Sequence, residues 1–201
     1  MKRLFLVLAC VGTLAGCAAD NGKDSPPEAV AAAAYRAPGP PSLTLFTMVN
    51  NRTGSGGHSA LLVNASQQVI FDPAGSFRDP RVVERGDVLY GITPTWLQTY
   101  KSAHARASYH VVSQNIEVTP AQAERALQLV MANGAVPGAY CTKSTTALLS
   151  SIPGFGQIHS TFYPTKLMAQ FETLPGVSTT RYYEDDAGDV IDAVQAAQLQ
   201  P

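Results

Sequence analysis

The sequence predicts one α+β domain that follows an export signal and a tether. Segments with the pattern of β-strands and segments with the pattern of α-helices are both frequent from residue 42 onward. They do not alternate strictly, as the strands and helices of a parallel α/β sheet do. Two of the strand-like segments are also joined by a turn short enough for a hairpin. These observations together favour the α+β class.

Residues 1–16 have the layout of an export signal. A positively charged start precedes an uncharged apolar run, which is shorter than the ~20 apolar residues of a membrane-spanning helix. The run ends in Leu14-Ala15-Gly16-Cys17, which matches the lipobox of bacterial lipoproteins. We therefore expect cleavage after Gly16 and attachment of lipid to Cys17.

The residues after the lipobox predict where the protein resides and how it is held. Ala18 occupies the position where an aspartate would retain a lipoprotein in the inner membrane. In a bacterium with two membranes, the periplasmic face of the outer membrane is then the expected location. Residues 17–41 are rich in Ala and Pro and poor in large apolar side chains, so we expect a flexible tether. The domain is expected to cover residues 42–201.

The strand-like segments share short length, β-branched residues and flanking turn residues. They are Leu43–Val49, His58–Val63, Gln68–Phe71, Val88–Ile92, Tyr109–Val118 and Val177–Tyr183. The polar residues 64–67 should join the second and third segments in a hairpin. Turn residues at 50–57 separate the first segment from the second, and Asp72-Pro73-Ala74-Gly75 ends the third.

The helix-like segments are marked by caps and by a period of 3.6 residues. Thr93-Pro94 and Thr119-Pro120 each supply a capping residue followed by Pro at the first helical position. The expected helices cover about 94–103, 121–133, 139–149, 164–171 and 190–199. Gly134 should stop the second of these helices. Its apolar face consists of Ala123, Ala126, Leu127, Val130 and Met131.

The cysteines raise the question of function. The chain has three, of which Cys10 leaves with the signal and Cys17 carries lipid. Cys141 is then the one thiol left, without a partner for a disulfide, in an oxidising compartment. Such a thiol is either buried filler or a reactive group. A helix N-terminus and a nearby imidazole lower the pKa of a thiol, and Cys141 is expected in the first turn of a helix.

His58 is the histidine best placed to meet Cys141. It starts a strand directly after a Gly-rich loop, where its ring could reach a cleft from a rigid element. A third polar group commonly orients such an imidazole. Asp72, at the end of the partner strand, is the first candidate, and Asn64 is the reserve. Asp72 could instead only cap the turn into Pro73.

The other three histidines are expected outside the site. His104 should end a surface helix, His110 lies on a strand, and His159 lies in the Gly-rich stretch after the cysteine helix. No set of side chains has metal-ligand spacing, and Glu184-Asp185-Asp186 is more typical of a solvated turn than of a calcium site. The sequence therefore predicts neither a metal nor a cofactor.

Two motifs resemble the circularly permuted NlpC-type papain-like group, which includes the lecithin–retinol acyltransferase-like proteins. They are Gly57-His58-Ser59-Ala60-Leu61-Leu62-Val63, followed by Val69-Ile70-Phe71-Asp72-Pro73-Ala74-Gly75, and the later Tyr140-Cys141-Thr142. The resemblance covers about residues 43–150. In that group the histidine strand precedes the cysteine helix, and a small antiparallel sheet packs on helices. The resemblance implies that Cys141 is the nucleophile, His58 the general base and Asp72 the orienting residue.

The chain departs from the pattern of this group at two positions. Many relatives have an asparagine before the cysteine, where this chain has Tyr140. Many also use a second histidine as the orienting group, for which Asp72 is the candidate here. The first departure affects the helix cap and the environment of an oxyanion. The second concerns the identity of the third catalytic residue.

The expected function is that of a cell-envelope thiol hydrolase or acyl-transfer enzyme. The resemblance implies an amide or ester substrate: an envelope peptide, a peptidoglycan stem peptide, an isopeptide bond or a lipid acyl group. The net charge of −1 and the absence of a basic stripe argue against a nucleic-acid partner. The alternative is a non-catalytic envelope lipoprotein of the same fold that acts as a binding or assembly module.

Overall fold

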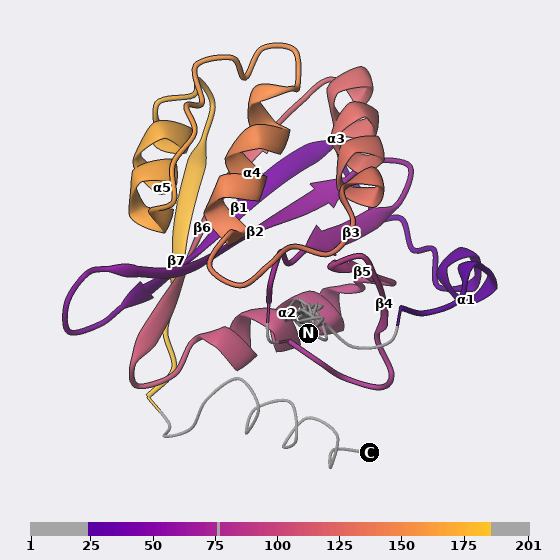
Figure 1. Ribbon diagram of the computed structural model, residues 1–201, viewed down its shortest axis with the longest axis horizontal. Coiled ribbons are helices and arrows are strands. Elements are labelled where there is room, and N and C mark those ends of the chain that lie inside the picture. The colour runs from indigo at the N-terminus through magenta and orange to yellow at the C-terminus, as the bar shows by residue number, and fades with distance from the viewer. Residues whose placement is uncertain (1–23, 76, 186–201) are drawn as a thin grey trace, which may run out of the picture.

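The computed structural model describes residues 24–75 and 77–185 (Figure 1). The export signal, Cys17 and the helix expected near residues 190–199 lie outside the described residues. Within them the chain has an α+β fold, in which a seven-stranded antiparallel sheet is packed with five helices.

The strands lie in the order β4-β5-β3-β2-β1-β6-β7 across the sheet. Their bounds are β1 Ser42–Asn50, β2 Gly56–Asn64, β3 Gln68–Phe71, β4 Val83–Arg85, β5 Val88–Tyr90, β6 Tyr109–Glu117 and β7 Ser178–Tyr182. The hairpin expected between the second and third segments is confirmed, with Leu61 opposite Phe71 and Asn64 opposite Gln68. The short strand β4 was not expected from the sequence.

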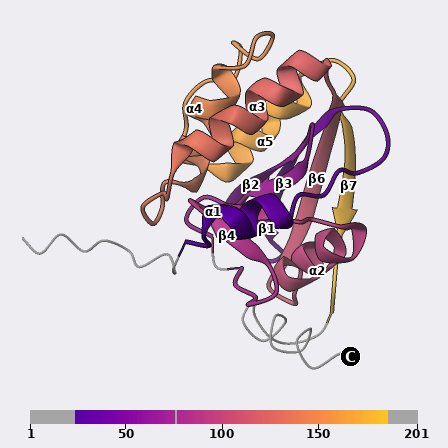
Figure 2. The ribbon, with the colours of Figure 1, turned by 90° about the vertical axis from the view of Figure 1, so that its right-hand side faces the viewer.

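The helices cover both faces of the sheet. They are α1 Pro27–Ala32, α2 Pro94–His104, α3 Pro120–Asn133, α4 Cys141–Ser150 and α5 Pro164–Glu172. Figure 2 shows α3, α4 and α5 on one face and α2 on the other. The expected caps are confirmed, since Thr93 accepts a hydrogen bond from the Trp96 N–H and Thr119 forms a capping box with Gln122. None of the described helices combines the length and the apolar character needed to cross a membrane.

Two apolar clusters sandwich the sheet because side chains alternate along each strand. On β1, Leu43 and Leu45 belong to the cluster under α3, α4 and α5, whereas Phe46 and Met48 face the cluster that contains Tyr100 of α2. His58 on β2 has the same parity as the residues that face α2. Ser59, its neighbour, points to the α4 side, where its Oγ lies 3.1 Å from the Thr142 Oγ1.

The N-terminal segment differs from the expected flexible tether. Residues 24–41 contain the short helix α1 and bond to the domain through their backbone. The Ser25 N–H donates to the Glu84 carbonyl, and the Tyr35 carbonyl accepts from the Gln68 N–H. Val30 packs against the core cluster. Because these contacts satisfy backbone groups and bury apolar surface, the segment lies on the domain from Asp24 onward.

The apolar face of α3 is narrower than the sequence indicated. Its alanines at 123 and 126, with Leu127 and Val130, are buried as expected. Met131 is 46% exposed, so its inclusion in the buried face was wrong. Met131 follows Val130 in the helix and therefore points about 100° away from it, whereas Val130 itself packs against the core.

A buried carboxylate holds the turn that follows β3. Asp87, itself at a φ of 61°, accepts hydrogen bonds at Oδ2 from the N–H groups of Ala74 and Val136, both at 2.8 Å. Its backbone carbonyl accepts from the Asp72 N–H at 2.8 Å. Asp87 therefore joins the end of β3 to the loop that leads into α4.

Replacing Asp87 by alanine should lower the free energy of unfolding by about 2–4 kcal/mol, because two N–H groups would lose their acceptor in a largely buried place. Urea unfolding measures this change. Asp87→Asn is the matched control, since an amide oxygen can still accept and asparagine tolerates a positive φ. Equal stability of Asp87→Ala and wild type would contradict a bracing role for this carboxylate.

Candidate active site

Cys141 is the first residue of α4, as the sequence predicts. In the preceding loop, Ala139 has a φ of 68°, a conformation that residues other than glycine seldom adopt. Tyr140 is the N-cap residue, and its side chain makes no capping hydrogen bond. The first N–H groups of a helix have no intrahelical acceptor and carry partial positive charge. The sulfur therefore lies where a thiolate is favoured.

A gap beside β2 lets the sulfur approach the sheet. β3 pairs with β2 only as far as Phe71 opposite Leu61, and Pro73 then turns the chain away. The β2 backbone at Ser59 thus lacks a β3 partner. The Ser59 N–H interacts with the Cys141 sulfur instead and helps to lower the pKa of the thiol. The Thr142 Oγ1 lies 3.7 Å from the same sulfur.

His58 links the thiol to a buried carboxylate. Its Nε2 lies 2.7 Å from the Asp72 Oδ1, and its ring also interacts with the Cys141 thiol, which contributes to the raised pKa of His58. With Nε2 on the carboxylate, Nδ1 is the nitrogen left to face the sulfur. The side chain of His58 is 15% exposed and that of Asp72 is 1% exposed. The structure thus brings together the residues that the sequence selected from three separate segments.

Tyr100 of α2 also binds the Asp72 carboxylate. Its hydroxyl donates to the same Asp72 Oδ1 at 2.7 Å, and its side chain is fully buried. The second carboxylate oxygen, Oδ2, is buried without a hydrogen-bond partner among the described residues. Gly75 leaves room for it, since a Cβ at this position would lie 1.8 Å from Oδ2. The carboxylate is therefore fixed by two donors and by the shape of the turn.

Asn64, the reserve candidate for orienting His58, lies elsewhere. It is at the opposite end of β2, opposite Ser42, and its Nδ2 donates to the Pro40 carbonyl. Two further histidines also have other contacts. The His110 Nδ1 lies 2.7 Å from the Asn51 Oδ1, and the His159 backbone bonds to Gln170.

His104 belongs to the cluster, which the sequence did not indicate. It ends α2 as expected, but its ring turns inward rather than to the surface. Its Nδ1 donates to the Tyr100 carbonyl at 2.8 Å. Its ring stacks with the ring of His58, and the two ring centroids are 6.2 Å apart. The missed signal was the spacing of four residues between Tyr100 and His104, which puts both on one helix face.

The buried charges determine the protonation of His58 and Asp72. Burial disfavours the charged imidazolium, but the Asp72 carboxylate more than compensates and raises the pKa of His58 to about 10. Burial likewise disfavours the carboxylate. The His58 charge and its hydrogen bond prevail and lower the pKa of Asp72 to about 2. At neutral pH the pair is therefore imidazolium and carboxylate.

The imidazolium in turn acts on the thiol. Burial raises the pKa of Cys141, but the hydrogen bond and charge of His58, with smaller contributions from the Ser59 N–H and Thr142, lower it to about 7. His104 behaves differently, because burial lowers its pKa and keeps it neutral. At a pH between the pKa of Cys141, about 7, and that of His58, about 10, the thiolate and the imidazolium coexist. This is the arrangement of an activated sulfur nucleophile.

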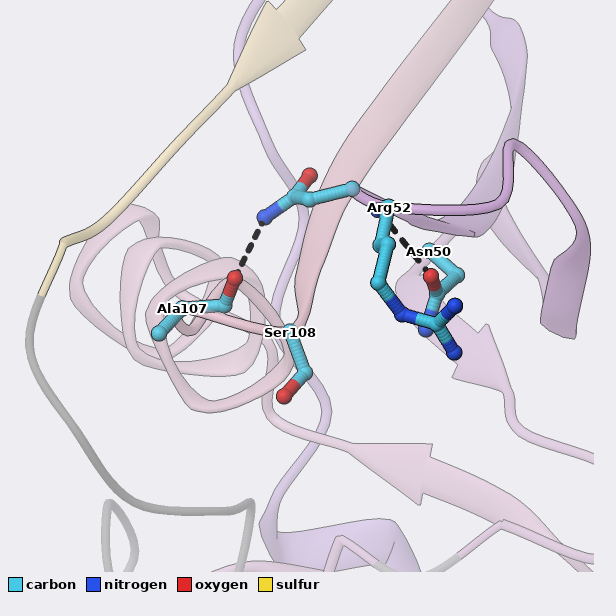
Figure 3. Close-up of a pocket in the computed structure, with 5 residues that line it drawn as sticks. Asn50, Arg52, Ala107 and Ser108 are labelled. Atoms are coloured by element: carbon cyan, nitrogen blue, oxygen red, sulfur yellow. Dashed lines mark hydrogen bonds between the residues drawn. The ribbon is translucent and has the colours of Figure 1, made fainter.

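Three hollows in the described surface are lined by other residues. One has a volume of about 380 Å³ and lies at the β1–β2 turn, between residues 50–52 and 107–108 (Figure 3). The others lie beneath α1, with about 430 Å³, and between α5 and the β6–β7 pair, with about 280 Å³. Neither Cys141 nor His58 contributes to these three.

Comparison of the chain with protein-family models, with curated proteins and with solved structures finds no match. Among the described residues, no group of three or more His, Cys, Asp or Glu side chains is arranged to hold a metal ion. The interpretation of the site therefore depends on its own geometry.

Alkylation of Cys141 should show the lowered thiol pKa. In a chain that begins at Ala18, Cys141 is the only cysteine. Its reaction rate with iodoacetamide should rise through pH 7, not through the ~8.5 of a free thiol. Asp72→Asn should shift this profile to higher pH, because the imidazole loses the charge that keeps it protonated. His110→Ala is the histidine control. A thiol that does not react at any pH would contradict the assignment.

Substitution of Gly75 tests whether the turn holds the carboxylate. The new Cβ of Gly75→Ala would overlap Asp72, so the carboxylate must move away from His58. We expect the alkylation profile to shift in the same direction as for Asp72→Asn, with a loss of about 1–3 kcal/mol in unfolding free energy. Gly138→Ala is the matched control, since a Cβ there meets nothing within 4 Å. An unchanged profile for Gly75→Ala would argue against this constraint.

Proposed function

We propose that this chain is a cell-envelope thiol hydrolase, with Cys141 as nucleophile, His58 as general acid and base, and Asp72 as the residue that orients His58. One observation carries the proposal: His58 interacts with the Cys141 thiol and with the Asp72 carboxylate at the same time, and Tyr100 holds that carboxylate. The four side chains come from β2, the turn after β3, α2 and α4.

In the first half of the reaction, the Cys141 thiolate forms a bond to the carbonyl carbon of an ester or amide. The π electrons of the carbonyl move to its oxygen, near the N–H groups that open α4. The His58 imidazolium then gives its proton to the leaving nitrogen or oxygen as the bond to that atom breaks. The product of this half is an acyl thioester on Cys141.

In the second half, water attacks the thioester carbon and gives a proton to the now neutral His58. The carbon–sulfur bond breaks, the acid leaves, and the thiolate–imidazolium pair is restored. Asp72 keeps its charge throughout and holds the ring through Nε2, so that Nδ1 remains directed at the sulfur. If an alcohol or amine replaces the water, the same steps give acyl transfer.

The order of the elements supports a circularly permuted papain-like arrangement. The histidine strand β2 precedes the cysteine helix α4, and an antiparallel sheet packs against that helix. The carboxylate of Asp72 occupies the role that a second histidine has in many proteins of that group. Tyr140, where many of those proteins have asparagine, is exposed and makes no cap bond, so the oxyanion would depend on backbone donors.

The substrate class follows from this chemistry and from the expected location. A thiol nucleophile with an imidazolium acid suits amide, isopeptide and ester bonds. A lipid-anchored chain would meet such bonds in envelope peptides, peptidoglycan stem peptides and acylated lipids. Among these we favour an amide of an envelope peptide.

One observation favours the alternative of a non-catalytic binding module. Cys141 is only 8% exposed, so a substrate carbonyl has limited access to the sulfur in this conformation. A binding module would keep the fold and its buried ion pair but would not turn over substrate.

Activity measurements separate the two functions. An activated ester, a peptide amide and purified cell wall serve as substrates for the chain that begins at Ala18. We expect Cys141→Ala and His58→Ala to lose about 10³-fold or more in kcat/KM, and Asp72→Asn to lose less, because it disturbs orientation but leaves the nucleophile. His110→Ala and Gly138→Ala should retain activity. Rapid alkylation of Cys141 without turnover of any substrate would favour the binding module.

A further inference from the structure

Exposed aromatic side chains gather where α4 and α5 begin, next to Cys141. Tyr140 precedes the cysteine, and Phe162 and Tyr163 precede α5. The Tyr140 and Phe162 rings meet edge to face with centroids 5.3 Å apart, so the two helix starts lie at one end of the domain. Figure 1 shows α4 and α5 side by side over the same face of the sheet. We call Tyr140, Phe162 and Tyr163, together with Lys143 and Lys166, the aromatic–lysine rim.

The rim concentrates apolar surface that elsewhere is buried. Tyr140 is 48% exposed, Phe162 is 49% and Tyr163 is 62%. Only two other large apolar side chains are exposed among the described residues, Met131 and Tyr183. Phe162 has no polar atom that could hydrogen-bond to water, so covering its ring with an apolar surface would be favourable.

Two lysines give the rim a positive charge. The Lys143 Nζ lies 5.5 Å from the centre of the Phe162 ring, and the Lys166 Nζ lies 4.8 Å from that of Tyr163. Lys143 also donates to the Ser160 Oγ. Within residues 24–75 and 77–185 neither ammonium forms an ion pair with a carboxylate. The chain as a whole has a net charge of −1, so the rim is a local excess of cations.

This combination matches the chemistry of an anionic lipid surface. Aromatic side chains settle at the boundary between headgroups and acyl chains, where an apolar ring and a polar end are both accommodated. Lysines extend along apolar surface and place their ammonium groups at lipid phosphates. A soluble acidic ligand would pair with the lysines but would leave the Phe162 ring in water.

We propose that the aromatic–lysine rim docks on an anionic phospholipid bilayer. The rings enter the headgroup boundary, and Lys143 and Lys166 pair with phosphates. Docking there brings Cys141 toward the lipid surface, so that membrane-held substrates reach the thiol. That last consequence rests on the proposed function, whereas docking itself does not require Cys141 to be reactive.

Co-sedimentation with lipid vesicles tests the proposal. The chain that begins at Ala18 is used, because it has every described residue but neither the signal nor the lipidated cysteine. It should bind vesicles that contain phosphatidylglycerol more tightly than vesicles of phosphatidylcholine alone. Lys143→Gln with Lys166→Gln should weaken binding to the anionic vesicles about 25-fold, about fivefold for each lysine. Phe162→Ala should weaken it about tenfold.

Matched controls make the result specific to this surface. Met131→Ala and Tyr183→Ala remove exposed apolar side chains elsewhere, and Lys101→Gln removes a lysine that lies over Tyr182 on the other face of the sheet. These variants and Cys141→Ala should bind as wild type, and thermal unfolding should show that every variant is folded.

Three outcomes would overturn the proposal. Wild type could fail to bind any vesicle, or the rim variants could bind as tightly as wild type. Soluble peptidoglycan fragments could instead bind at the rim, with loss on Phe162→Ala and no vesicle binding, which would make the rim a substrate surface. Vesicle binding without hydrolytic activity would leave docking intact and count only against the proposed function.

Discussion

The buried carboxylate of Asp72 is the group on which the rest of the site depends. A carboxylate almost fully removed from water is costly unless charge and hydrogen bonds compensate. Here His58 supplies the charge and one hydrogen bond, and Tyr100 supplies the other, both at Oδ1. The same ion pair keeps His58 protonated, and the charge of His58 lowers the pKa of the Cys141 thiol. Loss of the carboxylate would therefore affect the Cys141 thiol through His58.

The fold provides this arrangement by ending one strand early. Because β3 pairs with β2 only to Phe71, the Ser59 N–H is left for the Cys141 sulfur. The turn after β3 places Asp72 in contact with His58. Asp87 joins that turn to the loop before α4 by two hydrogen bonds. His58 thus lies between a carboxylate from one side of the sheet and a thiol from a helix on the other. The opposite placement of these partners gives the imidazole a separate function at each nitrogen.

The proposed hydrolase and the proposed lipid-docking surface involve the same end of the molecule. α4 begins with the thiol, and the residues flanking its start and that of α5 form the aromatic–lysine rim. The sulfur is largely covered in this conformation, whereas the rings beside it are exposed. A surface bound at the rim would therefore lie next to Cys141.

Local patterns in the sequence determined most of the secondary structure and the choice of the main candidate site residues. Turn residues, caps and periodicity predicted the main helices and strands, and the helix start at Cys141, the strand position of His58 and the turn at Asp72 selected the residues that meet. Proline and alanine content suggested a free tether, but backbone hydrogen bonds to Glu84 and Gln68 attach residues 24–41 to the domain. Tyr100 and His104 joined the site only through packing of α2 across the sheet. Periodicity shows which residues share a face, whereas long-range contacts decide what that face meets. For that reason only the tertiary structure could show that Asp72, the first candidate, meets His58 and that Asn64, the reserve, does not.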